Sequence, residues 1–230
     1  MSESESYKIG EREKKAIYSS RLFSGLPGAE FEAILNRSRA RGIRYKNGAT
    51  VVEAESRLDG FMILLSGHLQ GARENENGDL EFIQLYMPGE ICGLDIVCSE
   101  TRKCLFRIKA LDEVDLVFLD YDGMFSGKTL RRSVQKLQDG VNRYLANESL
   151  KRLHKIDILY RRSLREKVVV YLRNLSALSN SKKLELNMNR EQLAGYLGVN
   201  RSSLSEELSK MQKDGLINFH KSSFTILGEL

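Results

Sequence analysis

The sequence is poor in several residue types, and each shortage excludes a class of protein. It holds three cysteines, two prolines and no tryptophan among 230 residues. Three cysteines cannot build the disulfide framework of a small secreted protein, and so few prolines are not typical of a long disordered chain. The longest apolar runs, Phe61–Leu65 and Val168–Leu172, are too short to cross a bilayer. We therefore expect an ordinary globular chain without a membrane partner.

The N-terminus is not expected to be a secretory signal. Residues 1–15 are polar and charged, without the apolar stretch of a secretory signal. We expect a cytoplasmic protein whose cysteines are reduced. Residues 1–10 are rich in serine and glutamate and are expected to fray.

Charge is unevenly distributed, although the whole chain carries only +5. Residues 1–127 hold 16 basic and 21 acidic side chains, whereas residues 128–167 hold 12 basic and 4 acidic ones. An acidic N-terminal part beside a basic C-terminal part is typical of a DNA-binding protein with a separate sensing domain. A solvated basic helix has the same charge, so charge alone does not decide the function.

Short strands are predicted over residues 43–119. Apolar stretches of strand length alternate there with glycines, after residues 11–42, whose spacing indicates short helices. Asn77-Gly78 is a hairpin signal between residues 69–73 and 80–86. Evenly spaced strands of this kind are typical of a sandwich or a rolled barrel.

A long helix is predicted after the strands. Its apolar residues recur every three or four positions, at Leu130, Val134, Leu137, Val141 and Leu145, and again at Leu153, Ile156 and Leu159. This narrow stripe suits a seam between two helices, and it weakens around residues 147–149. Packing against the chain's own β region is the alternative, and both can hold for one helix. Residues 163–179 form a further helix, and residues 176–183 include a polar loop.

Residues 187–214 have the pattern of two short helices joined by a tight turn. Asn189 can cap the first helix, with Gln192 three residues on as in a capping box. Gly198 stands where the turn needs a positive φ, and Asn200 can cap the second helix. The two inner faces are apolar, at Leu193, Ala194, Leu197, Val199, Leu204, Leu208 and Met211. This pattern predicts a helix-turn-helix, whose second helix enters a major groove of DNA.

A hairpin is predicted directly after the second helix. The run 217–220, a turn at residues 221–223 and the run 224–227 together indicate a two-stranded wing. A helical pair used only for packing is the alternative, but it does not explain a short polar second helix followed by a hairpin.

The order of these parts resembles the Crp–Fnr family of bacterial transcription regulators, from about Leu22 to Leu230. The stretches that carry the resemblance are residues 65–67, 86–93 and 189–217. It implies an α+β chain with a cyclic-nucleotide-binding-like β-roll, a long dimerisation helix and a C-terminal winged helix-turn-helix. It also implies a homodimer formed through the long helix, with an effector or redox sensor in the β-roll and DNA binding by the winged helix.

Three parts are predicted on this basis. Residues 1–126 form the β-roll sensor domain with its N-terminal helices, residues 127–158 the dimerisation helix and hinge, and residues 159–230 the DNA-binding domain. The boundary lies near residues 155–162, where the long helix should end. The dimer seam is expected on Leu130, Val134, Leu137, Val141 and Leu145.

The resemblance also places the DNA contacts. Base contacts are expected from Arg201, Ser202, Ser205 and Glu206, and phosphate contacts from Ser203, Lys210 and Lys221. Arg201 matches the family's arginine at the head of the recognition helix. Glu206 stands where many members carry arginine, so it accepts from cytosine N4 or pairs with Arg201 or Lys210. A parallel dimer would read an inverted repeat.

The effector pocket departs from that of the cyclic-nucleotide members, which carry a Gly-Glu pair and then Arg-Ser. Here Leu94 follows Gly93, and Cys104 and Leu105 stand at the Arg-Ser positions. Without an arginine a buried phosphate would be unpaired, so cyclic AMP is not expected unless Arg102 fills that position. The expected pocket residues are Gly93, Leu94, Asp95, Cys104, Leu105 and Tyr144. The sequence identifies no cofactor, and the effector is less polar than a cyclic nucleotide, or absent.

Cys92, Cys98 and Cys104 raise the question of a redox sensor. An iron–sulfur cluster usually needs four cysteines, so none is expected. Nearby Arg102 and other basic residues would favour a thiolate, but buried structural cysteines are the favoured interpretation. His68 matches a haem ligand of some relatives, although a lone histidine on a strand is more often a surface residue.

Together these observations predict a dimeric, sequence-specific transcription regulator that binds double-stranded DNA. RNA polymerase is a partner if the protein activates transcription, and a small-molecule effector is a candidate partner. The alternative is a cyclic-nucleotide-type binding module whose winged helix mediates protein interaction. An enzyme is not expected, because His68 is the only histidine of the β region and a cupin-like metal site would have no ligands.

Overall fold

The computed structural model describes residues 4–228 except residues 21, 75–79, 127–130 and 187. The chain forms two compact units, Met1–Asn147 and Glu148–Leu230. The division falls inside the long helix α5 (Arg131–Tyr160), at the point where its apolar stripe weakens. The three predicted parts, 1–126, 127–158 and 159–230, stay a prediction. No helix of the described residues is long and apolar enough to span a membrane.

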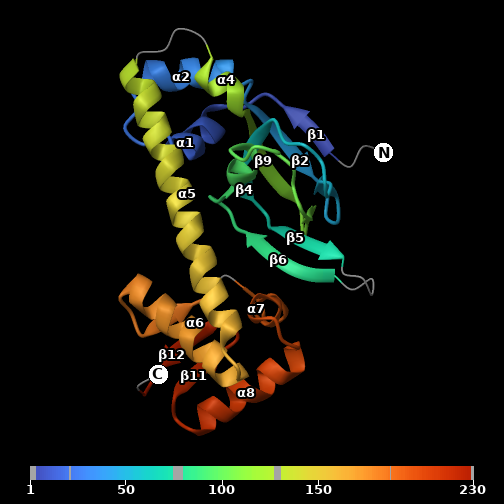
Figure 1. Ribbon diagram of the computed structural model, residues 1–230, viewed down its shortest axis with the longest axis vertical. Coiled ribbons are helices and arrows are strands. Elements are labelled where there is room, and N and C mark those ends of the chain that lie inside the picture. Colours follow the sequence, from blue (N-terminus) through green and yellow to red (C-terminus); the bar gives the residue numbers. More distant parts are fainter. Residues whose placement is uncertain (1–3, 21, 75–79, 127–130, 187, 229–230) are drawn as a thin grey trace. The chain divides into compact units, whose positions relative to one another are not determined.

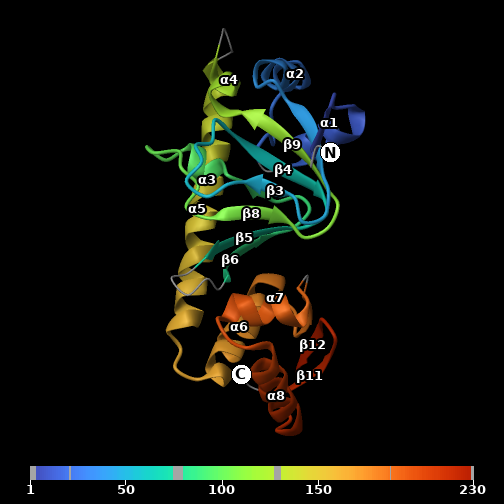
Figure 2. The same cartoon turned by 90° about the vertical axis from the view of Figure 1, so that its right-hand side faces the viewer.

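The N-terminal unit contains a β-roll with short helices beside it (Figures 1 and 2). Its strands are β1 (Ser4–Tyr7), β2 (Arg41–Tyr45), β3 (Thr50–Val52), β4 (Gly60–Ser66), β5 (Leu69–Glu74), β6 (Leu80–Tyr86), β7 (Ile91–Cys92), β8 (Arg107–Ala110) and β9 (Val114–Asp120). Its helices are α1 (Glu11–Ser19), α2 (Gly28–Arg37), α3 (Leu94–Val97), α4 (Tyr121–Phe125) and the first part of α5.

Two sheets make the roll. One has the strand order β1-β2-β9-β4-β7 and the other β3-β8-β5-β6. The predicted hairpin is confirmed, because β5 and β6 pair antiparallel from Leu69 opposite Tyr86 to Glu74 opposite Leu80. Its predicted turn, Asn77-Gly78, lies outside the described residues.

The first strand corrects the expectation that residues 1–10 fray. β1 pairs antiparallel with β2, from Ser4 opposite Tyr45 to Tyr7 opposite Gly42. The Tyr7 ring lies against Gly42, where an added Cβ would come within 2.2 Å of the ring. The Ser/Glu-rich composition gave no indication of this pairing, because Tyr7 is the aromatic residue that packs against the partner strand and the rest of β1 is polar.

Strand β4 is buried on both faces, which explains its uninterrupted apolar run. Side chains alternate along a strand, and Phe61 and Ile63 pack in the cluster formed with the helices. Met62 and Leu64 pack in the other cluster, which includes side chains of both sheets. The roll therefore has two apolar cores, with β4 between them.

The first part of α5 belongs to the core of the N-terminal unit. Leu137 and Val141 are 1% and 5% exposed and pack in the cluster that contains Phe61 and Ile63. Gly140 lies so close to Leu22 that a Cβ on it would be 2.5 Å from the Leu22 carbonyl oxygen. Only a residue without a side chain allows this approach.

The C-terminal unit has a core of its own. It contains the second part of α5 together with α6 (Leu164–Ser179), β10 (Lys183–Glu185), α7 (Arg190–Leu197), α8 (Arg201–Lys213), β11 (Ile217–His220) and β12 (Ser223–Ile226). The buried inner faces of α7 and α8 include Leu193, Leu197, Leu204, Leu208 and Met211, as the spacing predicted. Ser163 caps α6, and its hydroxyl accepts a hydrogen bond from the Glu166 amide.

Candidate nucleic-acid interface

The helix-turn-helix is confirmed in its local geometry. The Asn189 side chain accepts from the Gln192 amide at 2.9 Å, and the Gln192 side chain accepts from the Asn189 amide at 2.8 Å, which is the predicted capping box. Gly198 ends α7 with a φ of +65°. Asn200 occupies the cap position of α8, but its side chain accepts no capping hydrogen bond. Asn200 therefore stands at the expected cap position, but the expected hydrogen bond from its side chain is not made.

The outer face of α8 carries the predicted base-contacting residues. Arg201, Ser202, Ser203 and Glu206 are exposed and Ser205 is half-buried. The Ser205 hydroxyl donates to the Arg201 carbonyl at 3.0 Å. Its oxygen lone pairs stay available, so Ser205 presents an acceptor to a groove.

The charged residues of this face divide into a paired and an unpaired set. Glu206 pairs with Lys210 at 2.8 Å, and this contact lowers the pKa of the glutamate. Among the described residues no carboxylate pairs with Arg201. Of the two partners predicted for Glu206 the structure selects Lys210, which leaves the arginine fork free for a ligand.

The wing has three strands, where two were predicted. Its sheet has the order β10-β12-β11, and β10 (Lys183–Glu185) lies at the end of the predicted polar loop. The β11–β12 turn contains Lys221, which is exposed and has a φ of +52°. The Glu185 carboxylate accepts hydrogen bonds from the Ser223 hydroxyl and, at 3.0 Å, from the Ser222 hydroxyl, and these two bonds lower the pKa of Glu185. These contacts fix the turn that carries Lys221.

Sequence reasoning missed Arg190, the first residue of α7. Its guanidinium carbon lies 5.1 Å from the centroid of the Phe219 ring and 5.4 Å from that of Phe224. The guanidinium also donates to the Lys221 carbonyl at 3.0 Å. Burial, and next the charge of Arg201, lower the pKa of Arg190. The one signal in the sequence was a pair of phenylalanines, Phe219 and Phe224, in the two strands of the wing.

The predicted effector residues are dispersed over several environments. Gly93 directly precedes α3 with a φ of +86°, Asp95 is half-buried, and Leu94 is fully buried in the cluster with the helices. Cys104 is fully buried in the other cluster, whereas Leu105 is 67% exposed. The Tyr144 hydroxyl donates to the Ile91 carbonyl at 2.8 Å. These positions do not test the pocket, which stays a prediction.

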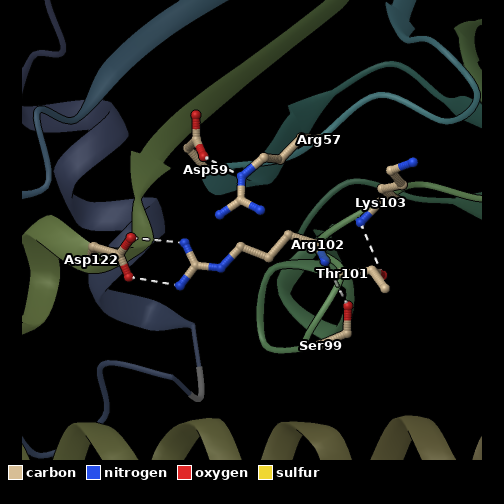
Figure 3. A network of polar contacts seen from close by, with 7 residues as sticks. All are labelled: Arg57, Asp59, Ser99, Thr101, Arg102, Lys103 and Asp122. Atoms are coloured by element: carbon tan, nitrogen blue, oxygen red, sulfur yellow. Dashed lines mark hydrogen bonds and ion pairs between the residues drawn. The ribbon is translucent and has the colours of Figure 1, made fainter.

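Arg102 is engaged by the protein itself. Its two terminal nitrogens donate to the two oxygens of Asp122 at 2.7 and 2.9 Å, and Figure 3 shows this fork-to-fork contact with Arg57 and Asp59 beside it. The contact raises the pKa of Arg102 and lowers that of Asp122. Both terminal nitrogens of Arg102 are engaged, so an anion that binds this guanidinium would compete with Asp122.

The cysteines do not have the environment of reactive thiolates. Cys92 and Cys104 are fully buried, Cys98 is half-buried, and burial raises the pKa of all three thiols. Basic neighbours such as Arg102 do not offset this burial. The suggestion that they favour a thiolate is therefore corrected, and buried structural cysteines remain the better interpretation.

His68 has a local partner. Its Nδ1 lies 2.6 Å from a carboxylate oxygen of Asp112, whose other oxygen accepts from the His68 amide at 2.7 Å. These contacts join the turn before β5 to the turn before β9. The described residues contain no cluster of three or more His, Cys, Asp or Glu that could hold a metal ion.

The single chain does not test the predicted dimer seam, which stays a prediction. Leu137 and Val141 are buried in the core of their own unit, and Val134 and Leu145 are half-buried. Side chains already buried in the single chain have little surface left for a partner. Leu130 lies outside the described residues. The second part of α5, in contrast, exposes Leu150, Leu153, Ile156 and Tyr160.

Known proteins share this organisation. Residues 43–126 match the family described as the cyclic nucleotide-binding domain, and residues 166–228 match the Crp-like helix-turn-helix domain. Two solved structures share the fold. One is a CooA mutant from Carboxydothermus hydrogenoformans, with a TM-score of 0.66, 16% identity and coverage of 96% of this chain and 94% of that one. The other is FixK2 from Bradyrhizobium japonicum, with a TM-score of 0.62, 14% identity and coverage of 83% and 93%.

Curated relatives extend over most of the chain. The transcriptional regulatory protein btr of Bordetella pertussis is 24% identical over 213 residues, which cover 86% of this chain and 81% of that protein. The fumarate and nitrate reduction regulatory protein of Vibrio cholerae is 22% identical over 189 residues, which cover 79% and 73%. These relatives are transcription regulators and not enzymes. The chain therefore belongs to the Crp–Fnr family of transcription regulators, with a DNA-binding helix-turn-helix and a sensor domain.

Proposed function

We propose that the protein is a homodimeric regulator that recognises an inverted repeat in double-stranded DNA. The observation that carries this proposal is Arg201, an exposed arginine at the head of α8 that pairs with no carboxylate of the described residues. An arginine fork of this kind suits the O6 and N7 acceptors of guanine. A cation without a partner loses no internal contact when it binds a base.

The other residues of α8 supply the remaining base contacts. Ser205 can accept from an exocyclic amine, because its hydroxyl hydrogen is directed to the Arg201 carbonyl. Glu206 is ionised and exposed, so it can accept from cytosine N4 but cannot contact guanine O6. Ser202 is exposed beside them. The half-site should therefore contain both a guanine and a cytosine contact.

Phosphate contacts surround this face. Ser203, Lys210 and Lys221 are exposed, and Arg190 is held by the aromatic pair of the wing. The exposed pair between Lys210 and Glu206 is weak, because such pairs contribute about 0–1 kcal/mol. Lys210 can therefore exchange its carboxylate for a phosphate at little cost. These contacts position the protein without reading sequence.

The dimer seam is proposed on the second part of α5. Leu150, Leu153, Ile156 and Tyr160 are 55%, 57%, 48% and 83% exposed. At about 100° per residue these four side chains lie within one third of the helix circumference. An apolar stripe of this width suits a parallel two-helix contact.

The β-roll is proposed as the sensor. Its effector is not cyclic AMP, since Cys104 and Leu105 replace the Arg-Ser pair and Arg102 is bound by Asp122. We place the protein in the cytoplasm because its target is DNA. RNA polymerase is a partner if the protein activates transcription.

Selection of randomised duplexes by the purified, effector-free protein tests this proposal. Enrichment of an inverted repeat, with half-sites about one duplex turn apart, would support the dimeric regulator. Salt-sensitive binding without sequence enrichment, both alone and with cell-extract metabolites added, would contradict it. That result would favour a winged helix that mediates protein interaction.

A further inference from the structure

A cavity of about 460 Å³ lies between the start of α7 and the β11–β12 turn. Cavities of roughly 300–1,000 Å³ hold small molecules in other proteins. The described residues that line it all belong to the C-terminal unit, and the segment before α7 is fixed to the turn by a hydrogen bond from the Leu186 amide to the Ser222 carbonyl at 2.9 Å. The cavity is thus built within one core rather than between parts of the chain.

The walls combine apolar and cationic groups. Leu186, Met188, Leu193 and Phe224 contribute the apolar part. The cationic part is Arg190 and Lys221, and among the described residues neither pairs with a carboxylate. The site therefore offers two positive charges beside an apolar surface.

Arg190 is held in place before any ligand arrives. The rings of Phe219 and Phe224 are nearly parallel, at 19° and with centroids 5.6 Å apart, and the guanidinium lies beside both. Its hydrogen bond to the Lys221 carbonyl uses one terminal nitrogen. A cation that is desolvated and pre-positioned binds an anion more strongly than a mobile surface lysine does.

We propose that this cavity binds a small amphipathic anion, with an aliphatic or aromatic body against the apolar walls and a carboxylate on Arg190 and Lys221. Charge complementarity selects the anionic head, and the apolar walls select the body. An effect on DNA binding rests on the proposed function, in which Arg190 and Lys221 also contact DNA phosphates. Occupation of the cavity by such an anion would compete with DNA.

Octanoate is the probe for the test, and 1-octanol is the matched uncharged molecule. The full-length protein is labelled with ¹³C at its methionine methyl groups, of which the chain has six. The Met188 signal is assigned by its loss in Met188→Leu. Octanoate should shift this signal saturably, and 1-octanol and inorganic phosphate should shift it far less.

Variants test the role of the cation. Arg190→Gln should weaken octanoate binding about tenfold, as expected for a hydrogen bond to a charged group. Arg190→Lys, which keeps the charge, should retain most of the affinity. Lys213→Gln is the matched control, because Lys213 is an exposed cation of α8 outside the cavity. The other methionine signals show whether each variant is folded.

Three results would overturn the proposal. These are no saturable shift of Met188, an equal shift with 1-octanol, and an equal shift with inorganic phosphate alone. Competition is measured by fluorescence anisotropy on the selected duplex, where octanoate should raise the Kd of the wild type at about tenfold lower concentration than it raises that of Arg190→Gln. If the protein binds a specific DNA sequence but octanoate does not shift the Met188 signal, this proposal is wrong and the proposed function stands. If octanoate binds but no DNA sequence is enriched, the proposed function is wrong and the assignment of the cavity stands.

Discussion

Several arginines of the β-roll are held differently from those of the helix-turn-helix and wing. In the β-roll, Arg44, Arg57, Arg73, Arg102 and Arg107 each face a carboxylate within 3.5 Å. On the helix-turn-helix and wing, Arg190 and Arg201 face none among the described residues. Arg165, which joins α6 to Glu207 and Asp214, shows that this unit also pairs arginines where they serve its own packing. The lack of a carboxylate does not mark an anion site by itself, since Arg41 of β2 also faces none among the described residues and lies over the Phe118 ring. At the head of α8, where the side chain is exposed, it leaves Arg201 available to an external anion.

The apolar residues of α5 also differ between the two units, in how far they are exposed. Leu137 in the first part is buried in its own unit, whereas Leu153 in the second part is 57% exposed. We expect Leu153→Glu to weaken dimerisation at least about 100-fold, because the dimer would bury two unpaired carboxylates in an apolar contact. Specific DNA binding should fall with it. Sedimentation equilibrium measures the dimer constant.

The matched control for this prediction is Leu178→Glu. Leu178 is 76% exposed but lies on α6, away from the proposed seam. It should leave the dimer constant unchanged. An unchanged dimer constant in Leu153→Glu would place the seam elsewhere.

Two alanine variants compare the effect on DNA affinity of losing Arg201, which has no carboxylate partner among the described residues, and of losing Arg102, which pairs with Asp122. Arg201→Ala should lower affinity for the selected duplex about 10- to 100-fold, as expected for the loss of one bidentate base contact. Arg102→Ala should leave that affinity unchanged in the effector-free protein, because its guanidinium is bound by Asp122. Fluorescence anisotropy with the selected and a scrambled duplex measures both. An equal loss on the two duplexes in Arg201→Ala would make Arg201 a phosphate contact.

Arg190→Gln should have a smaller effect that does not depend on sequence. Loss of one phosphate contact should reduce the slope of log affinity against log salt by about 1. Affinity for selected and scrambled duplexes should fall by the same factor. A salt slope equal to that of the wild type would show that Arg190 does not contact DNA.

Asp122→Asn tests the paired arginine of the sensor and should have the smallest effect. The pKa of Asp122 is lowered from its ordinary value of 3.8 by Arg102. A carboxyl group whose pKa is lower in the folded than in the unfolded protein stabilises the fold at pH values above its unfolded-state pKa. This contribution is lost as the pH falls through its folded-state pKa. Because the pair is exposed, we expect about 1 kcal/mol or less at pH 7.

Denaturation midpoints at a series of pH values measure this contribution. The difference between wild type and Asp122→Asn should be present at pH 7 and should narrow as pH falls below 3.8. A difference that does not depend on pH would mean that the Asp122 charge is not the source of the stability.

The sequence predicted features whose chemistry is local. The capping box at Asn189, the positive φ of Gly198 and the hairpin joining β5 to β6 each depend on a few neighbouring residues, and all are confirmed. The buried faces of α7 and α8 followed from helical spacing. The family resemblance supplied the order of the domains.

The errors concern contacts between residues distant in sequence. The stripe on α5 predicted that Leu137 and Val141 are buried and left open whether the chain's own β region or a second helix buries them, because helical spacing does not identify the burying surface. β1 and β10 were missed because their pairing partners lie far along the chain. Arg190 was missed for the same reason, since Phe219 and Phe224 lie about thirty residues away.

The close approach of Gly140 to Leu22 has a consequence for how the sensor can change shape. A screw motion of α5 that put a neighbouring residue in the place of Gly140 would bring a Cβ against the Leu22 carbonyl oxygen, where it cannot fit. This contact therefore fixes the register of the first part of α5 on the segment that contains Leu22. We expect a conformational change in the N-terminal unit to preserve that register.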